Sequence, residues 1–77
     1  MLFLIEYDRS RGEIISLRTY PDTERDTAGE DRLSIELDLR GTGIEREIVL
    51  LEAASKEALM KTHRRYFESL TALAKAS

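Results

Sequence analysis

The spacing of apolar side chains changes once along this chain, near Ala53, and that change constrains the fold more than any other feature. Before it, apolar residues recur at about every second position, which is the period of a half-buried strand. After it, they recur about every 3.6 residues, the period of an amphipathic helix. The sequence therefore predicts an α+β domain whose strands come first and whose one long helix comes last.

Four segments are predicted as strands: residues 1–7, 13–20, 32–40 and 44–52. In residues 32–40 the alternation is complete, with apolar side chains at Leu33, Ile35, Leu37 and Leu39. Gly12 ends the link between the first two segments, and Gly41 and Gly43 lie between the last two, so each pair is expected to form a β-hairpin. Hairpins join neighbours, which favours a four-stranded antiparallel meander.

The segment between the two expected hairpins, residues 21–31, shows no apolar period. Pro21 is expected to stop the second strand, and most of the charged side chains at 22–31 are acidic, with Arg25 as the only base. This segment is predicted to be a flexible, exposed acidic loop.

Residues 55–76 are predicted to form a C-terminal amphipathic helix packed on one face of the sheet. Ser55 is a suitable N-cap, and Glu57 and Lys75 have the signs that the helix dipole favours at its two ends. The apolar side of the helical projection contains Leu59, Met60, His63, Tyr66, Phe67, Leu70, Leu73 and Ala74.

The first and last predicted strands are apolar on both faces, whereas one helix covers only one face. The chain has 77 residues and no cysteine, so it buries a small core without disulfides. A second copy or another protein is therefore expected to cover the second face. The expected interface consists of Leu2, Leu4, Val49 and Leu51, and the protein is predicted to be a homodimer.

The sequence offers few groups for catalysis or metal binding. The absence of cysteine excludes thiol chemistry and Cys-ligated metals, and His63 is the only histidine. His63 falls on the apolar side of the predicted helix, where a packed imidazole is the simpler interpretation than a general base. Asp22, Glu24 and Asp26 begin like a calcium loop, but the glycine and the final glutamate are missing. No enzyme activity, cofactor or metal is predicted.

A basic surface is the alternative functional site. Residues 53–77 carry five basic and two acidic side chains, whereas residues 1–52 carry seven and thirteen. The candidate residues for nucleic-acid or phosphate binding are Lys61, Arg64 and Arg65 of the predicted helix, with Arg9 and Arg11 of the first hairpin tip. The surrounding acidic residues weaken this hypothesis, because nucleic acid would meet a small positive stripe in a negative field.

The first hypothesis for function is therefore a small intracellular protein-interaction module, homodimeric and without catalytic activity. No segment approaches the length of a membrane span, and the N-terminus does not resemble a signal peptide, so a cytoplasmic location without membrane partners is expected.

Overall fold

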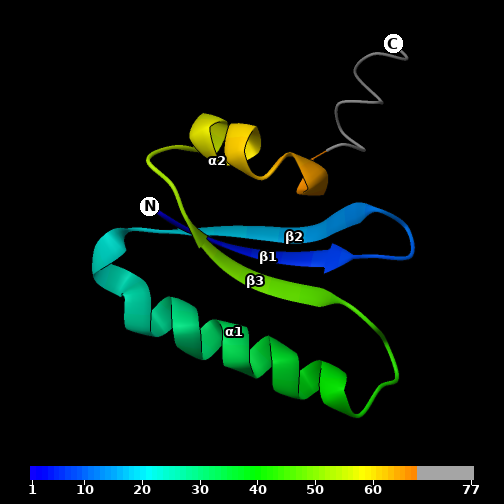
Figure 1. Cartoon of the computed structure of the whole chain (residues 1–77). Helices are drawn as coiled ribbons and strands as arrows, with labels where there is room; N and C mark the ends of the chain where they lie inside the picture. The colour runs from blue at the N-terminus through cyan, green and yellow to red at the C-terminus, as the bar shows by residue number, and fades with distance from the viewer. Residues whose placement is uncertain (68–77) are drawn as a thin grey trace.

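The computed structural model describes residues 1–67, in which a three-stranded antiparallel sheet lies between two helical layers (Figure 1). The strands are β1 (Leu2–Asp8), β2 (Glu13–Tyr20) and β3 (Glu47–Glu52). The α-helices are α1 (Arg25–Arg40) and α2 (Lys56–Thr62), and the 3-10 helices are η1 (Asp22–Glu24) and η2 (Arg64–Tyr66). The fold is α+β, but the predicted four-stranded sheet with one C-terminal helix is wrong.

The sheet order is β2-β1-β3, so the first strand lies in the centre and not at an edge. The first hairpin is present: Gly12 has a φ of 67°, and its N–H donates to the carbonyl of Asp8 at 2.8 Å. A bulge in β2 shifts the register between Glu6 and Tyr7, whose partners are Ser16 and Ile14. The predicted meander is wrong because the chain leaves β2 through a helix and returns to the far side of β1.

The predicted strand at 32–40 and the predicted loop at 21–31 are both wrong, because they form η1 and the continuous helix α1. Three of the acids that suggested a solvated loop, Asp22, Glu24 and Asp26, lie in the first turns of η1 and α1, where the helix dipole favours negative charge. Tyr20 donates a hydrogen bond to Asp31 at 2.6 Å and Arg25 pairs with Glu52 at 3.2 Å, which ties α1 to the sheet.

The alternation at 33, 35, 37 and 39 has a different meaning in a helix. Two residues along an α-helix correspond to a rotation of about 200°, so alternate residues point to opposite sides. Ile35 packs with the cluster that contains Ala28, against the sheet. Leu33 and Leu37 point the other way and are 54% and 52% exposed. The period-two pattern therefore marks a helix that is apolar on two opposite faces.

The second predicted hairpin is also wrong, because residues 41–46 connect α1 to β3 and not two strands. β3 begins at Glu47 instead of residue 44. Gly43 has a φ of 73°, which lets the chain turn back from the helix toward the sheet.

The predicted helix at 55–76 is shorter in the described residues. Its N-cap is confirmed, since the Ser55 hydroxyl accepts a hydrogen bond from the Ala58 N–H at 3.1 Å. α2 ends at Thr62, where His63 takes non-helical angles, and η2 comes next. The part of the prediction at 68–76 lies outside the described residues.

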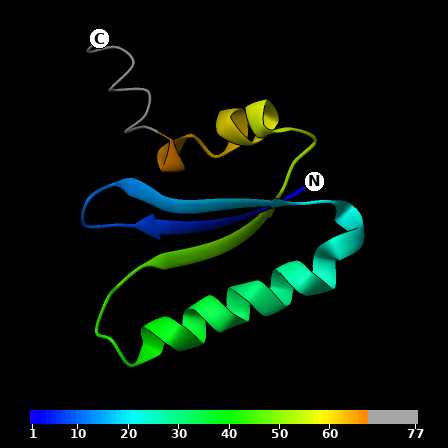
Figure 2. The same ribbon diagram turned by 180° about the vertical axis from the view of Figure 1, so that it is seen from behind.

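Both faces of the sheet are covered by the chain itself, so the expectation of a single helical cover is wrong (Figure 2). On one face, Leu2 and Leu4 pack with α1. On the other, Phe3 and Ile5 pack with α2 and η2 through Leu59, Tyr66 and Phe67. The four β1 side chains are each at most 1% exposed, which makes β1 the centre of the core.

Gly29 lies at an exposed position within α1, where a substitution tests whether the helix has room for a side chain. Apart from its chain neighbours and the backbone of its own helix, a Cβ at this position would have no atom within 4 Å. Gly29→Ala is therefore expected to raise the free energy of unfolding by about 0.5 to 1 kcal/mol, because alanine restricts the unfolded chain and favours helix. Thermal melting by circular dichroism measures this. Gly43→Ala is the matched control and should lower stability, because Gly43 has a positive φ. Unchanged or lower stability for Gly29→Ala would contradict the account.

Candidate functional site

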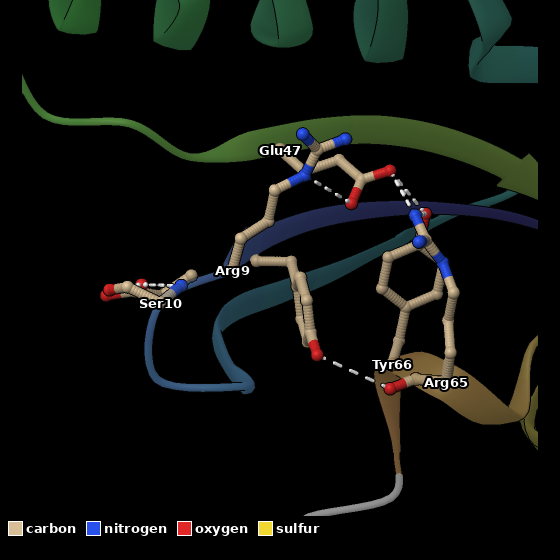
Figure 3. A network of polar contacts seen from close by, with 7 residues as sticks. Arg9, Ser10, Glu47, Arg65 and Tyr66 are labelled. Carbon is tan, nitrogen blue, oxygen red and sulfur yellow. Dashed lines mark hydrogen bonds and ion pairs between the residues drawn. The ribbon is translucent and has the colours of Figure 1, made fainter.

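The densest polar cluster of the described residues surrounds Glu47, at the start of β3 (Figure 3). The Tyr66 hydroxyl donates to Oε1 of Glu47 at 2.9 Å, and Arg65 Nη2 forms an ion pair with the same oxygen. Arg9 Nε donates to Oε2 at 3.5 Å. One carboxylate thus joins the hairpin tip, β3 and η2, three segments that are distant in sequence.

Aromatic rings hold this cluster against the sheet. The rings of Tyr7 and Tyr66 meet edge to face, with centroids 5.1 Å apart. The guanidinium of Arg65 lies 4.6 Å from the centre of the Tyr66 ring and also donates to its hydroxyl at 2.8 Å. These contacts fix η2 over the end of the sheet and make the cluster a structural clamp.

The carboxylate of Glu47 is only 15% exposed, and its environment favours the charged form. Burial acts to raise its pKa, but the hydrogen bond from Tyr66 and the charges of Arg65 and Arg9 together outweigh burial, so the pKa of Glu47 is lowered from 4.5. The clamp therefore stays charged at neutral pH.

This lowered pKa predicts acid sensitivity. A carboxyl whose folded pKa lies below its unfolded value contributes stability above the unfolded value, here 4.5, and loses it as the pH falls through the folded pKa. We expect wild-type protein to lose more stability between pH 7 and about pH 3 than Glu47→Gln does. Urea unfolding at several pH values measures the difference. Parallel pH profiles for the two proteins would contradict this role of Glu47.

The structure brings together some residues of the predicted basic surface. Arg9 and Arg65 meet at Glu47, although they are exposed by 69% and 58%. Arg11 lies in the same hairpin tip as Arg9 and Arg64 precedes Arg65 in η2, while Lys61 lies exposed on α2. These cations could be identified from the sequence, but Glu47 could not, because it is distant in sequence from both Arg9 and Arg65.

The four residues of the predicted interface do not share a surface. Leu2 and Leu4 are buried on the α1 side of the sheet, each 1% exposed. Val49 and Leu51 are half-buried on the opposite side, next to the core cluster beneath α2. This interface was predicted because one face of the sheet was expected to be uncovered. The chain covers that face itself, so this reason no longer holds.

His63 lies half-buried where α2 gives way to η2. Its ring centroid is 6.5 Å from that of Tyr66. Within residues 1–67, no group of three or more histidine, aspartate or glutamate side chains is arranged to hold a metal ion.

The outward side of α1 is a feature that the sequence analysis missed. Leu33 and Leu37 project there with more than half of their surface exposed, and Ile44 beyond the helix is 49% exposed. Glu30 and Arg40 are exposed on the same helix. The available signal was the spacing of Leu33 and Leu37 by four residues, which fits one side of a helix as well as one face of a strand.

A shallow hollow of about 340 Å³ lies beside the end of α1. It is lined by Glu36, Leu39, Arg40, Gly43, Ile44, Glu45, Arg46 and Ile48. Arg46 reaches from this hollow to an ion pair with Glu6 on β1. The side chains that line the hollow do not include a nucleophile next to a general base, so the hollow supports no catalytic assignment.

Comparison with known proteins gives no family assignment: no family model matches the chain, and no curated protein or solved structure is significantly similar to it. Among the helices of residues 1–67, none has both the length and the apolar character needed to cross a membrane.

Proposed function

We propose that this chain is a non-catalytic protein-interaction module that works by associating with a second copy of itself. The observation that carries the proposal is the pair Leu33 and Leu37, whose side chains are 54% and 52% exposed on the outward side of α1. Two exposed leucines one turn apart on a helix offer an apolar contact that a partner helix can cover.

The covering of the sheet supports this choice of surface. Leu2 and Leu4 are already buried, so they have no need of a partner. Among residues 1–67, three of the five exposed large apolar side chains, Leu33, Leu37 and Ile44, belong to α1 and the connection that comes after it. Met1 and Ile15 are the other two. Of these five, Leu33 and Leu37 lie one turn apart on the same side of α1, so a single partner helix could cover both.

Light scattering coupled to size exclusion tests self-association directly. We expect the wild-type mass to rise from one copy toward two as the concentration increases from roughly 1 to 100 µM, the range in which small interfaces associate. A single-copy mass over the whole range would overturn the proposal.

The basic surface remains the second candidate, as a nucleic-acid or phosphate site. It is favoured by the meeting of Arg9 and Arg65 at one end of the sheet. It is weakened by the same contacts, because Glu47 partly neutralises both cations. Fluorescence anisotropy with a single-stranded oligonucleotide separates the candidates: a binding constant that falls steeply with salt supports this surface, and no binding at low salt rejects it.

A further inference from the structure

The outward positions of α1 are spaced as in the contact line of a coiled coil. From the first turn to the last they are Asp26, Glu30, Leu33, Leu37 and Arg40, with successive spacings of four, three, four and three residues. This is the heptad spacing that keeps side chains on one side of a helix facing a partner helix. All five residues are exposed in the structure. The line has leucines at its centre and charges at its ends.

The charges along this line are arranged by sign. Acids lie before the two leucines and Arg40 lies after them. Glu30 and Arg40 make no ion pair with any of the residues that the structure describes. They are ten residues apart, which is about 15 Å along the helix, so they cannot pair within one chain.

We infer that two copies of this chain associate through their α1 helices, packed antiparallel along this line. The antiparallel register places Leu33 of one copy on Leu37 of the other, and Glu30 of one copy beside Arg40 of the other. The two-fold axis generates each contact twice, as in any isologous interface. This inference rests on the proposed function and specifies its surface.

The parallel arrangement is disfavoured by the same charges. It would place each Glu30 beside the other Glu30 and each Arg40 beside the other Arg40, which is repulsive at both ends. Only the antiparallel register buries both leucines and places each Glu30 beside an Arg40.

Gly29 is compatible with this arrangement. It neighbours the line, and no side chain of its own chain lies within 4 Å of where its Cβ would be. A helix pair of this length forms an interface at the small end of the known range, so we expect a dissociation constant in the micromolar range.

Charge exchange tests the register. Glu30→Arg places two arginines together at each end of the line, and Arg40→Glu places two acids together. Each single variant is expected to raise the dissociation constant about 10-fold or more. The double variant, Glu30→Arg with Arg40→Glu, restores an opposite pair at both ends and should associate nearly as well as wild type.

Mixing the single variants gives a second test. A copy with Glu30→Arg and a copy with Arg40→Glu have complementary charges at both ends in the antiparallel register. We therefore expect the equimolar mixture to form dimers where each variant alone does not. Sedimentation velocity measures the masses, and circular dichroism checks that each variant is folded.

Two further variants complete the design. Leu33→Gln combined with Leu37→Gln should abolish association, because it removes the apolar centre while keeping good helix formers. Arg64→Glu is the matched control, since it reverses an exposed charge on η2, and its mass should equal that of wild type.

The outcomes separate the inference from the proposed function. A wild-type protein that stays a single copy overturns both. A wild-type dimer that all α1 variants leave intact overturns the inference alone and moves the interface elsewhere, for example to the open edge of β3. Weakened single variants that neither the double variant nor mixing restores also overturn the antiparallel register.

Discussion

Replacing Phe3 with alanine is expected to lower the free energy of unfolding by about 3 to 5 kcal/mol. Phe3 is 1% exposed in the central strand and packs in the cluster with Leu59, Tyr66 and Phe67. The variant loses the transfer free energy of the ring and leaves a cavity that α2 and η2 cannot fill. A domain of this size has a total stability of roughly 4 to 12 kcal/mol, so the loss is a large part of it.

Urea unfolding followed by circular dichroism measures this effect as a shift of the midpoint. Ile15→Ala is the control, because Ile15 is 39% exposed on the edge strand β2 and its truncation should cost much less. Similar losses for the two variants would contradict a core centred on β1.

Leu4→Glu is expected to unfold the protein or to release α1 from the sheet. The new carboxylate would lie where Leu4 is now, 1% exposed and packed in the cluster with Ala28 and Ile35. Burying an unpaired charge costs several kcal/mol, comparable with the whole stability of a small domain. Far-ultraviolet circular dichroism should show a clear loss of helix.

Leu37→Glu is the matched control for Leu4→Glu, since it makes the same substitution on the exposed side of α1. Measured at roughly 1 µM or below, where the protein is expected to be a single copy, its stability should change by roughly 0.5 kcal/mol or less, as at other exposed positions. A folded Leu4→Glu with full helix content would contradict the packing of α1 on the sheet.

The first hairpin could be predicted because its signals are local. Residues 1–7 and 13–20 have the right period, and Gly12 supplies the positive φ that the link requires. The cap of α2 was equally accessible, because Ser55 bonds to a backbone group three residues away. Local chemistry determines these elements, so the sequence was sufficient.

The helix α1 could not be separated from a strand by periodicity alone. Leu33, Ile35, Leu37 and Leu39 satisfy a strand with one apolar face, and they also satisfy a helix with two. Tertiary contacts decide between them, since Ala28, Ile35 and Tyr20 join one buried cluster only when the segment is helical. The wrong strand prediction for this segment also led to the wrong sheet order and to the expectation of an uncovered sheet face.

The candidate sites also depend on contacts that local sequence patterns do not show. Arg9, Arg64 and Arg65 were identified as cations, but the clamp depends on Glu47, which is 18 residues from Arg65 and 38 from Arg9. The outward line on α1 was hidden by the strand interpretation, although its residues all lie within one segment of 16 residues. Once the segment is known to be helical, spacing and charge alone define that line.

An isotope-filtered NOE spectrum of a one-to-one mixture of labelled and unlabelled protein tests the central claim most directly, because it separates contacts within a copy from contacts between copies. The chain covers both faces of its own sheet. We propose that a second copy contacts the outward side of α1. We predict cross-peaks between copies that join the methyl groups of Leu33 and Leu37, and none from Leu2 or Leu4. Cross-peaks between copies from Leu2 or Leu4, with none from α1, would contradict the account.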